Sequence, residues 1–216
     1  KRRVKGVFSK LVSPNVVTEL LSTEKLNFGG ARREITVLFA DVRGFTQLTD
    51  LNQENAEKFV REHHLTGAAA EAYFSEQAQE TLNTVNIYLS AIADQIKKHD
   101  GTLDKYIGDC VMAFWGAPTP NAKHAVACVR AAMDAQIAMH LLNLERVAKN
   151  ELRAAENVQR LAAGQEPLHP LPILALGTGI NSGTAIVGMM GSEAHIINYT
   201  VFGREVNLAS RLEGVS

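Results

Sequence analysis

Two aspartates that lie far apart in the sequence both stand beside apolar segments. Asp41 directly follows the apolar run EITVLFA, and Asp109 lies in the motif DKYIGDCVMAFW, residues 104 to 115. Apolar residues on both sides of Gly108-Asp109 predict a β-hairpin, because glycine and aspartate tolerate the backbone angles of tight turns. Two carboxylates held close together repel each other unless a cation lies between them, and Mg²⁺ takes such oxygen ligands together with substrate phosphates. The pair predicts a divalent-metal site, provided that the fold brings both residues to one edge of a sheet.

Two further segments could bind phosphate groups. The sequence VRGFT, residues 42 to 46, joins a strand to a helical region, and its Gly44 would let backbone N–H groups approach phosphate oxygens closely. Asn207 and Arg211 are four residues apart on an expected helix, so they share one face, where the guanidinium could hold a phosphate. Each segment taken alone equally fits an ordinary turn or a surface ion pair.

Lys105 lies four residues before Asp109 in a short expected strand. We expect it to be in phase with Leu103 and Ile107, because side chains alternate along a strand. A lysine on the same side as two apolar residues lies either at an exposed edge of the sheet or in a cleft, and the spacing alone favours the edge.

The elements that must position these residues follow from hydrophobic patterning. Residues 34 to 40 form a nearly continuous apolar run, which predicts a central strand buried on both faces. The remaining expected elements are a helix in one or two pieces over 53 to 99, a hairpin over 103 to 115, a long helix over 121 to 163, strands over 173 to 181, 184 to 190 and 197 to 203, and a helix over 204 to 214. The order predicts an α+β fold with a ferredoxin-like βαββαβ core, helices on one face of the sheet, and an added hairpin and C-terminal helix.

Composition limits the class of protein. The chain has 216 residues, 46% of them hydrophobic, and a formal net charge of -1, which supports one sizeable domain and argues against nucleic-acid binding. Two cysteines indicate a reducing, cytoplasmic setting. We see no apolar run that approaches the length of a membrane span, about 20 residues, and no signal peptide or internal repeat. The chain begins at Lys1, which indicates a fragment, and a short helix is expected after Ser13-Pro14.

Four segments, in order, resemble the catalytic domain of the class III nucleotidyl cyclases: VLFADVRGFT, LDKYIGDCVMAFWGAP, GTGINSGTAIVGMMGSE and NYTVFGREVNLASRLE. The resemblance runs from about Arg32 to Glu213. It implies a lead-in over residues 1–31 and a catalytic domain over residues 32–216. Any one of the motifs would be modest support, whereas four in order are strong support.

The resemblance also implies the roles of individual residues. Asp41, Asp109 and the backbone carbonyl of Val42 match the ligands of two Mg²⁺ or Mn²⁺ ions. The other matches are Gly44, Phe45 and Thr46 for the phosphate loop, Lys105 and Thr200 for reading the purine, Asn207 for orienting the ribose, and Arg211 for stabilising the transition state. Members of this family pair head to tail, so the two aspartates would come from one subunit and the purine, ribose and transition-state residues from the other.

The implied activity is conversion of ATP to cyclic AMP and pyrophosphate by a homodimer. Lysine offers only hydrogen-bond donors and suits the N1 acceptor of adenine, whereas members that make cyclic GMP typically carry glutamate at this position. The alternatives are a catalytically silent nucleotide-binding regulatory module, a guanylate cyclase, and an interaction-only protein that would leave both aspartates and the arginine unused.

The chain departs from the family pattern at several places. It carries extra sequence near residues 59–81 and 143–170, which we expect to lengthen helices or form surface projections. Arg204-Glu205 stands where relatives often have Asp-Thr, and we expect little catalytic effect from this change. The chain ends at Ser216, short of the family's terminal strands. Similar lead-ins often follow sensory or membrane-anchoring segments, so the domain would be cytoplasmic, either by itself or as the cytosolic part of an anchored protein.

Overall fold

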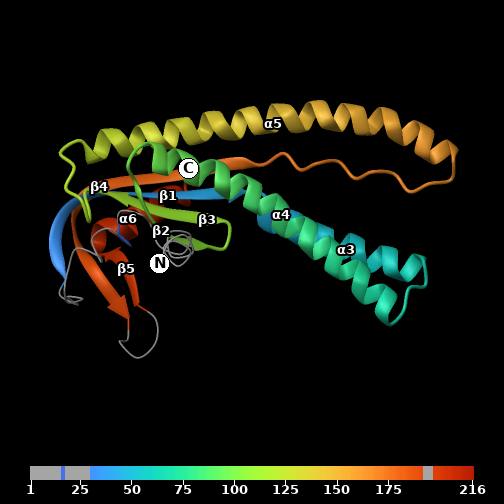
Figure 1. Ribbon diagram of the computed structural model, residues 1–216, viewed down its shortest axis with the longest axis horizontal. Helices are drawn as coiled ribbons and strands as arrows, with labels where there is room; N and C mark the ends of the chain where they lie inside the picture. Colours follow the sequence, from blue (N-terminus) through green and yellow to red (C-terminus); the bar gives the residue numbers. More distant parts are fainter. Residues whose placement is uncertain (1–15, 18–29, 192–196) are drawn as a thin grey trace, which may run out of the picture. The chain divides into compact units, whose positions relative to one another are not determined.

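The computed structural model of the chain describes residues 16–17, 30–191 and 197–216 (Figure 1). The helix expected after Ser13-Pro14 lies outside the described residues, apart from Val16 and Val17, which are helical. The chain forms two compact units. Unit 1 comprises residues 1–41, 89–135 and 177–216, and unit 2 comprises residues 42–88 and 136–176.

A five-stranded sheet with the order β2-β3-β1-β4-β5 organises unit 1. The elements in chain order are β1 (Ala31–Arg43), α3 (Phe45–Glu62), α4 (Ala68–Lys98), β2 (Thr102–Ile107), β3 (Cys110–Trp115), α5 (His124–Ala162), β4 (Ala175–Gly191), β5 (Ile197–Phe202) and α6 (Arg204–Glu213). The first four strands have the βαββαβ order, and β5 and α6 follow as additions. The expected α+β, ferredoxin-like fold is confirmed, with β1 as the central strand.

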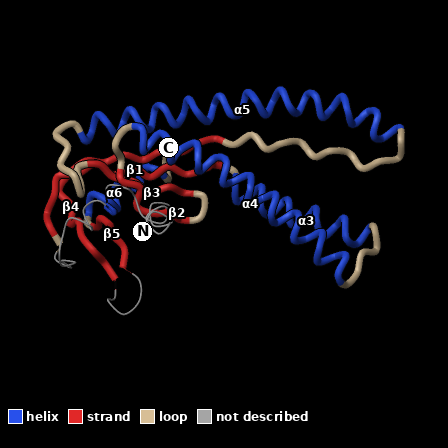
Figure 2. Tube along the Cα trace, viewed as in Figure 1, coloured by secondary structure: helices blue, strands red, loops and turns tan. Residues whose placement is uncertain are grey.

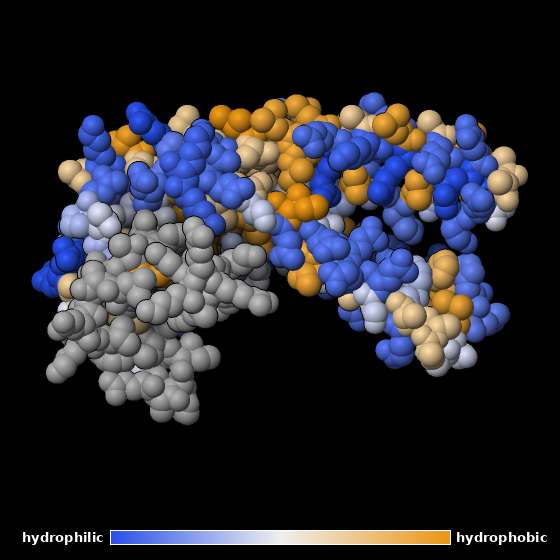
Figure 3. Space-filling view, viewed as in Figure 1, coloured by the Kyte–Doolittle hydropathy of each residue, from blue (hydrophilic) through white to orange (hydrophobic). Residues whose placement is uncertain are grey.

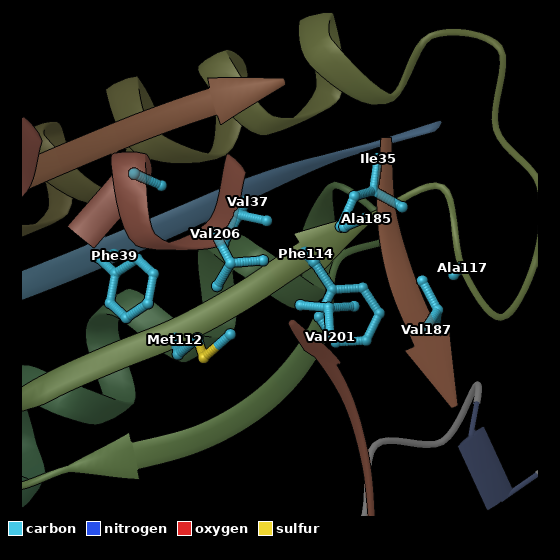
Figure 4. Close-up of a cluster of buried hydrophobic side chains, with 11 residues drawn as sticks. Ile35, Val37, Phe39, Met112, Phe114, Ala117, Ala185, Val187, Val201 and Val206 are labelled. Atoms are coloured by element: carbon cyan, nitrogen blue, oxygen red, sulfur yellow. The ribbon is translucent and has the colours of Figure 1, made fainter. Parts of the chain in front are cut away.

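Helices lie on both faces of the sheet: α5 begins on one face, and the added C-terminal helix α6 packs on the other. The residues that form the core on one face are Ile35, Val37, Phe39, Met112, Phe114, Ala117, Ala185, Val187, Val201, Val206 and Ala209 (Figure 4). Val206 and Ala209 belong to α6, which therefore packs on this face. Thr36 points to the other face, where its Oγ1 lies 2.7 Å from Nδ1 of His124, the first residue of α5.

β4 is one continuous strand of 17 residues, whereas the sequence predicts two strands joined by Ser182-Gly183. A Ser-Gly pair favours a turn in isolation. Here the Ser182 hydroxyl lies 2.6 Å from the Thr36 hydroxyl of the neighbouring strand, and this cross-strand contact accompanies an unbroken strand.

Both stretches described as extra sequence fall in unit 2, where residues 59–81 are mostly helical and residues 143–162 are helical. Residues 59–81 end α3 and begin α4, and the break between them lies at His64 and Gly67, which have φ angles of 51° and 54°. The helical region begins at Phe45, earlier than the predicted residue 53. Residues 143–162 form the second half of α5.

A seven-residue repeat in α5 holds the proline-rich segment that follows this helix, and the sequence analysis missed it. Figure 2 shows this segment as a loop that runs back along α5. Asn150 and Asn157 each exchange two hydrogen bonds with the backbone N–H and C=O groups of Leu171 and Leu168, at 2.6 to 2.9 Å. Asn143 donates to the carbonyl of Leu174 at 2.7 Å.

Arginines repeat with the same spacing. Arg146, Arg153 and Arg160 donate to the carbonyls of Pro172, His169 and Glu166 respectively. Seven helical residues rise about 10.5 Å, close to the length of three extended residues, so helix and loop stay in register. The segment gains partners for its backbone groups although its prolines cannot donate, and side chains supply what a neighbouring strand would otherwise provide.

Much of the outer surface of α5 is apolar. Figure 3 shows hydrophobic side chains gathered along this helix, and its exposed large apolar residues are Val126, Val129, Met133, Ile137, Leu141, Leu144, Val147, Leu152, Val158 and Leu161. Among the described residues, α5 is the one helix whose length and composition would allow a membrane crossing. This is weak support for a span, because Cys128, Ala131 and Ala135 on the same helix are buried in the core of unit 1.

The asparagine repeat can be tested by replacing Asn150 with alanine. The change leaves the N–H and C=O groups of Leu171 without their side-chain partner, so we expect the free energy of unfolding to fall by about 1–3 kcal/mol. Urea denaturation measures this loss, and faster hydrogen exchange at the Leu171 amide locates it. Glu151→Ala, at the exposed neighbouring position, is the control. Equal stability of the two variants would contradict the role of the repeat.

Candidate active site

The pairing of β1 with β3 brings the two aspartates of the predicted metal site together. Asp41 pairs directly with Cys110 across the antiparallel ladder, and Asp109 precedes Cys110 in the turn between β2 and β3. The predicted two-residue turn is confirmed, since Ile107 pairs with Cys110 and Gly108 has a φ of 63°. Residues 68 positions apart in the sequence thus occupy one end of the sheet.

The pKa of the Cys110 thiol is raised by burial and by the negative charges at this end of the sheet. Burial and the negative charges of Asp41, Glu213 and Asp109, in that order, raise the pKa of Cys110 to about 12. Glu213 lies at the end of α6, and the sequence analysis did not assign it to the site. Three carboxylates from three elements therefore lie within electrostatic range of a single side chain.

This acidic end fits a divalent cation in its donor chemistry. Carboxylate oxygens are hard ligands, and Mg²⁺ is usually held by one or two of them while substrate phosphates and water complete the shell. Within the described part of the chain, no group of three His, Cys, Asp or Glu side chains is positioned to hold a metal by itself. Asp41 and Asp109 would hold the ion, with phosphate oxygens and water as the remaining ligands.

The predicted phosphate loop belongs to unit 2 and leads into a helix N-terminus. Val42 is fully buried near the end of β1. Gly44 has a left-handed φ of 85°, which residues other than glycine rarely adopt. Gly44 is the N-cap of α3, which begins with Phe45 and Thr46, and no side chain caps this end. The N–H groups of the first helical turn have no partners within the helix, which is the arrangement that suits phosphate oxygens.

Lys105 and Thr200, the predicted purine-reading pair, are in contact. Lys105 Nζ donates to Thr200 Oγ1 at 3.3 Å, and the Thr200 side chain is buried. Lys105 lies on β2 and Thr200 on β5, which are the two edge strands of the five-stranded sheet. The sheet must curve strongly for its opposite edges to meet, as twisted sheets with additional bulges do.

A β-bulge corrects the predicted phase of Lys105. Leu103 pairs with Ala113 and Lys105 pairs with Met112, so the register shifts at Asp104. Paired residues point to the same face of a sheet, and Ala113 and Met112 point to opposite faces because they are consecutive. Lys105 therefore shares its face with Ile107 but not with Leu103.

Helix α6 carries the predicted ribose and transition-state residues. Asn207 and Arg211 lie on its exposed face, one turn apart as predicted, and Val206 and Ala209 are buried beneath them. Asn181 of β4 donates to both the backbone carbonyl and the carboxylate of Glu205, at 3.0 and 2.8 Å. Glu205, one of the two residues that depart from the family pattern, thus anchors the start of α6.

Gly179 allows α6 to lie directly on β4. A Cβ atom at this position would approach the Ala209 carbonyl oxygen and the Glu213 nitrogen to 2.2 Å, and both of these are backbone atoms. Such a contact cannot be relieved by turning a side chain. Gly179 therefore sets the depth at which α6 packs, and with it the position of Asn207 and Arg211.

Solved structures with a similar fold include two nucleotide cyclases. The adenylyl cyclase CyaB from P. aeruginosa aligns with a TM-score of 0.58 and 31% identity, covering 87% of this chain and 74% of the other. The guanylyl cyclase Cya2 aligns with a TM-score of 0.57 and 30% identity, covering 87% of this chain and 72% of the other. The fold and the arrangement of acidic residues thus define a domain of the nucleotide cyclase class.

The family follows from a match over most of the chain. The family model described as the adenylate and guanylate cyclase catalytic domain matches residues 30–216, and the chain belongs to this family. Relatives include adenylate cyclase 1 of Rhizobium meliloti, 28% identical over 89% of this chain, and an adenylate cyclase of Anabaena cylindrica, 28% identical over 100% of it. The chain spans only 23% and 33% of the length of these two relatives.

Gly179→Ala tests how α6 is seated. We expect the variant to lose about 1–3 kcal/mol of unfolding free energy, because a methyl group forces the helix backbone away from β4. Thermal and urea denaturation measure this loss. Gly214→Ala is the control, since its φ is -62° and an added Cβ would meet nothing closer than 3.6 Å. Equal stability of the two variants would refute the close packing.

The acidic environment of Cys110 predicts slow alkylation. A thiol with a pKa of about 12 stays protonated at pH 8, so iodoacetamide should react with it far more slowly than with an ordinary cysteine. Asp41→Asn removes a negative charge, lowers the pKa of Cys110 and should speed its alkylation. Cys128, whose pKa burial alone raises to about 12, should not change. The same rate at Cys110 in wild type and variant would count against the convergence of charges.

Proposed function

We propose that the domain is an adenylate cyclase, which converts ATP to 3′,5′-cyclic AMP and pyrophosphate. The observation that carries this proposal is the contact between Lys105 and Thr200, which lie 95 residues apart and on opposite edges of the sheet. An ammonium donor beside a hydroxyl complements adenine, whose N1 accepts and whose 6-amino group donates. Overall similarity leaves the base open, because the neighbours at 30–31% identity include an adenylyl and a guanylyl cyclase.

Asp41 and Asp109 would hold two Mg²⁺ or Mn²⁺ ions together with the triphosphate. When bound, such ions lower the pKa of the attacking hydroxyl and offset charge on the phosphates. The Val42 carbonyl would be a further ligand. Gly44, Phe45 and Thr46 would surround the phosphates with backbone N–H groups at the start of α3.

The reaction is an in-line attack of the ribose 3′-oxygen on the α-phosphorus, with pyrophosphate as the leaving group. Asn207 would orient the ribose, and Arg211 would stabilise the charge that develops on the α-phosphoryl group. Both side chains lie on the exposed face of α6, which suits a site completed by a second chain. We propose a head-to-tail homodimer in which Asp41 and Asp109 act with Lys105, Thr200, Asn207 and Arg211 of the other copy.

Purified protein incubated with Mg²⁺ or Mn²⁺ should form cyclic AMP from ATP and much less cyclic GMP from GTP. Asp41→Ala should lower kcat by about 10³-fold or more, because it removes a proposed ligand of the metal ions that offset the charge of the triphosphate. Chromatographic separation of the products measures both activities. Wild-type turnover no higher than that of Asp41→Ala would show a silent nucleotide-binding module, and a preference for GTP would show a guanylate cyclase.

Mixing two inactive variants tests the shared site. Asp41→Asn and Arg211→Ala should each be inactive alone, yet a heterodimer of the two has one site with both residues intact. Random pairing should restore about a quarter of wild-type activity, since half of the dimers are mixed and half of their sites are complete. Specific activity of the wild type should also rise with protein concentration. No recovery on mixing, with both variants shown to be folded, would refute the shared arrangement.

A further inference from the structure

Asp104 is a buried carboxylate attached to the Lys105–Thr200 pair. Its side chain is fully buried, whereas that of Lys105 is 36% exposed. Thr200 Oγ1 donates to Asp104 Oδ2 at 2.5 Å, and Lys105 Nζ lies 3.1 Å from Asp104 Oδ1 in an ion pair. A buried carboxylate is costly unless it is paired and hydrogen-bonded. These two contacts and a hydrogen bond from the Val201 backbone offset that cost.

The β-bulge in β2 makes this arrangement possible. In a regular strand Asp104 and Lys105 would point to opposite faces. Because the register shifts between Leu103 and Lys105, Asp104 is the extra residue of the bulge, and both it and Lys105 reach the same threonine. Bulges frequently re-aim side chains beside active sites.

The contact with Asp104 fixes the direction of the Thr200 hydroxyl. A threonine hydroxyl can donate one hydrogen bond and accept others, so by itself it suits either type of group on a base. An ionised carboxylate only accepts hydrogen bonds, and here it accepts one from the Thr200 hydroxyl. Burial raises the pKa of Asp104, and the Thr200 hydrogen bond and the Lys105 charge oppose this by stabilising the ionised form. The Thr200 hydroxyl can then only accept a hydrogen bond from a ligand.

We propose that Asp104 is a positioning residue for base specificity, which holds the Thr200 hydroxyl as an acceptor so that the site selects adenine over guanine. The inference rests on the proposed function. Lys105 would donate to N1 of adenine and Thr200 would accept from its 6-amino group. Guanine presents an N–H at position 1 and a carbonyl oxygen at position 6, so it would place a donor against Lys105 and an acceptor against Thr200.

Asp104→Asn provides the test, because it removes the charge at nearly constant volume. The asparagine amide can turn its NH₂ group toward Thr200, which frees the hydroxyl to donate. We expect the ratio of kcat/KM for ATP to that for GTP to fall by about tenfold or more. Asp94→Asn, an exposed acidic residue on α4, is the matched control and should leave the ratio unchanged.

A second set of variants asks whether Asp104 acts through Thr200. Thr200→Ser keeps the hydroxyl and should preserve the ratio, whereas Thr200→Val removes it and should lower the ratio. In the Thr200→Val background, Asp104→Asn should cause no further fall. An unchanged ratio in Asp104→Asn, or an equal fall with and without the Thr200 hydroxyl, would overturn the inference. Either result would still be compatible with the proposed function, which is tested by cyclic AMP formation.

A substrate analogue tests the same point in the wild-type protein, so that the main result does not depend on whether a variant folds. Purine riboside triphosphate keeps the N1 acceptor but lacks the 6-amino donor. Wild-type protein should use it several-fold less efficiently than ATP, and the difference should shrink in Asp104→Asn. Equal use of the two nucleotides by the wild type would overturn the role of Thr200 as an acceptor. The absence of cyclic AMP formation from ATP by the wild type would instead defeat the proposed function.

Discussion

The antiparallel pairing of β1 with β3 is the interaction on which the rest of the site depends. It sets Asp41 opposite Cys110, and the two-residue turn then leaves Asp109 next to that position. Because side chains alternate with a period of two, a slip of one residue would turn Asp41 to the other face and exchange the side chains that β1 buries on its two faces. The packing of Val37 and Phe39 in the core beneath α6 thus also fixes the register of the acidic residues.

Two further constraints place the residues that would face a nucleotide. The sheet curves until its edge strands meet at Lys105 and Thr200, and the bulge at Asp104 turns a second side chain toward the same point. In addition, Gly179 lets α6 approach β4 closely, and Asn181 holds the start of that helix through hydrogen bonds to Glu205. Gly179 and Asn181 therefore position α6, the helix that carries the proposed ribose and transition-state residues.

Unit 2 solves a different physical problem. Its proline-rich segment cannot join a ladder as a donor at each position, yet its backbone groups still need partners. The asparagines and arginines of α5 supply them at a spacing of seven residues. The sequence analysis noted the extra length here but missed the repeat. Helix prediction relies on the spacing of apolar residues, and this repeat consists of polar asparagine and arginine.

The sequence by itself determined the element order, the central strand, the Gly108-Asp109 turn and the family, because these follow from local patterning and from motifs that are continuous in the chain. It could not determine that β4 continues through Ser182-Gly183, that α6 packs on the face opposite the start of α5, or that Asp104 joins the purine pair. Those features depend on contacts between strands and helices that are distant in sequence, and on a bulge that breaks the alternation on which strand prediction relies. Only the tertiary structure decided which side chains share a face and which hydroxyl proton is already engaged.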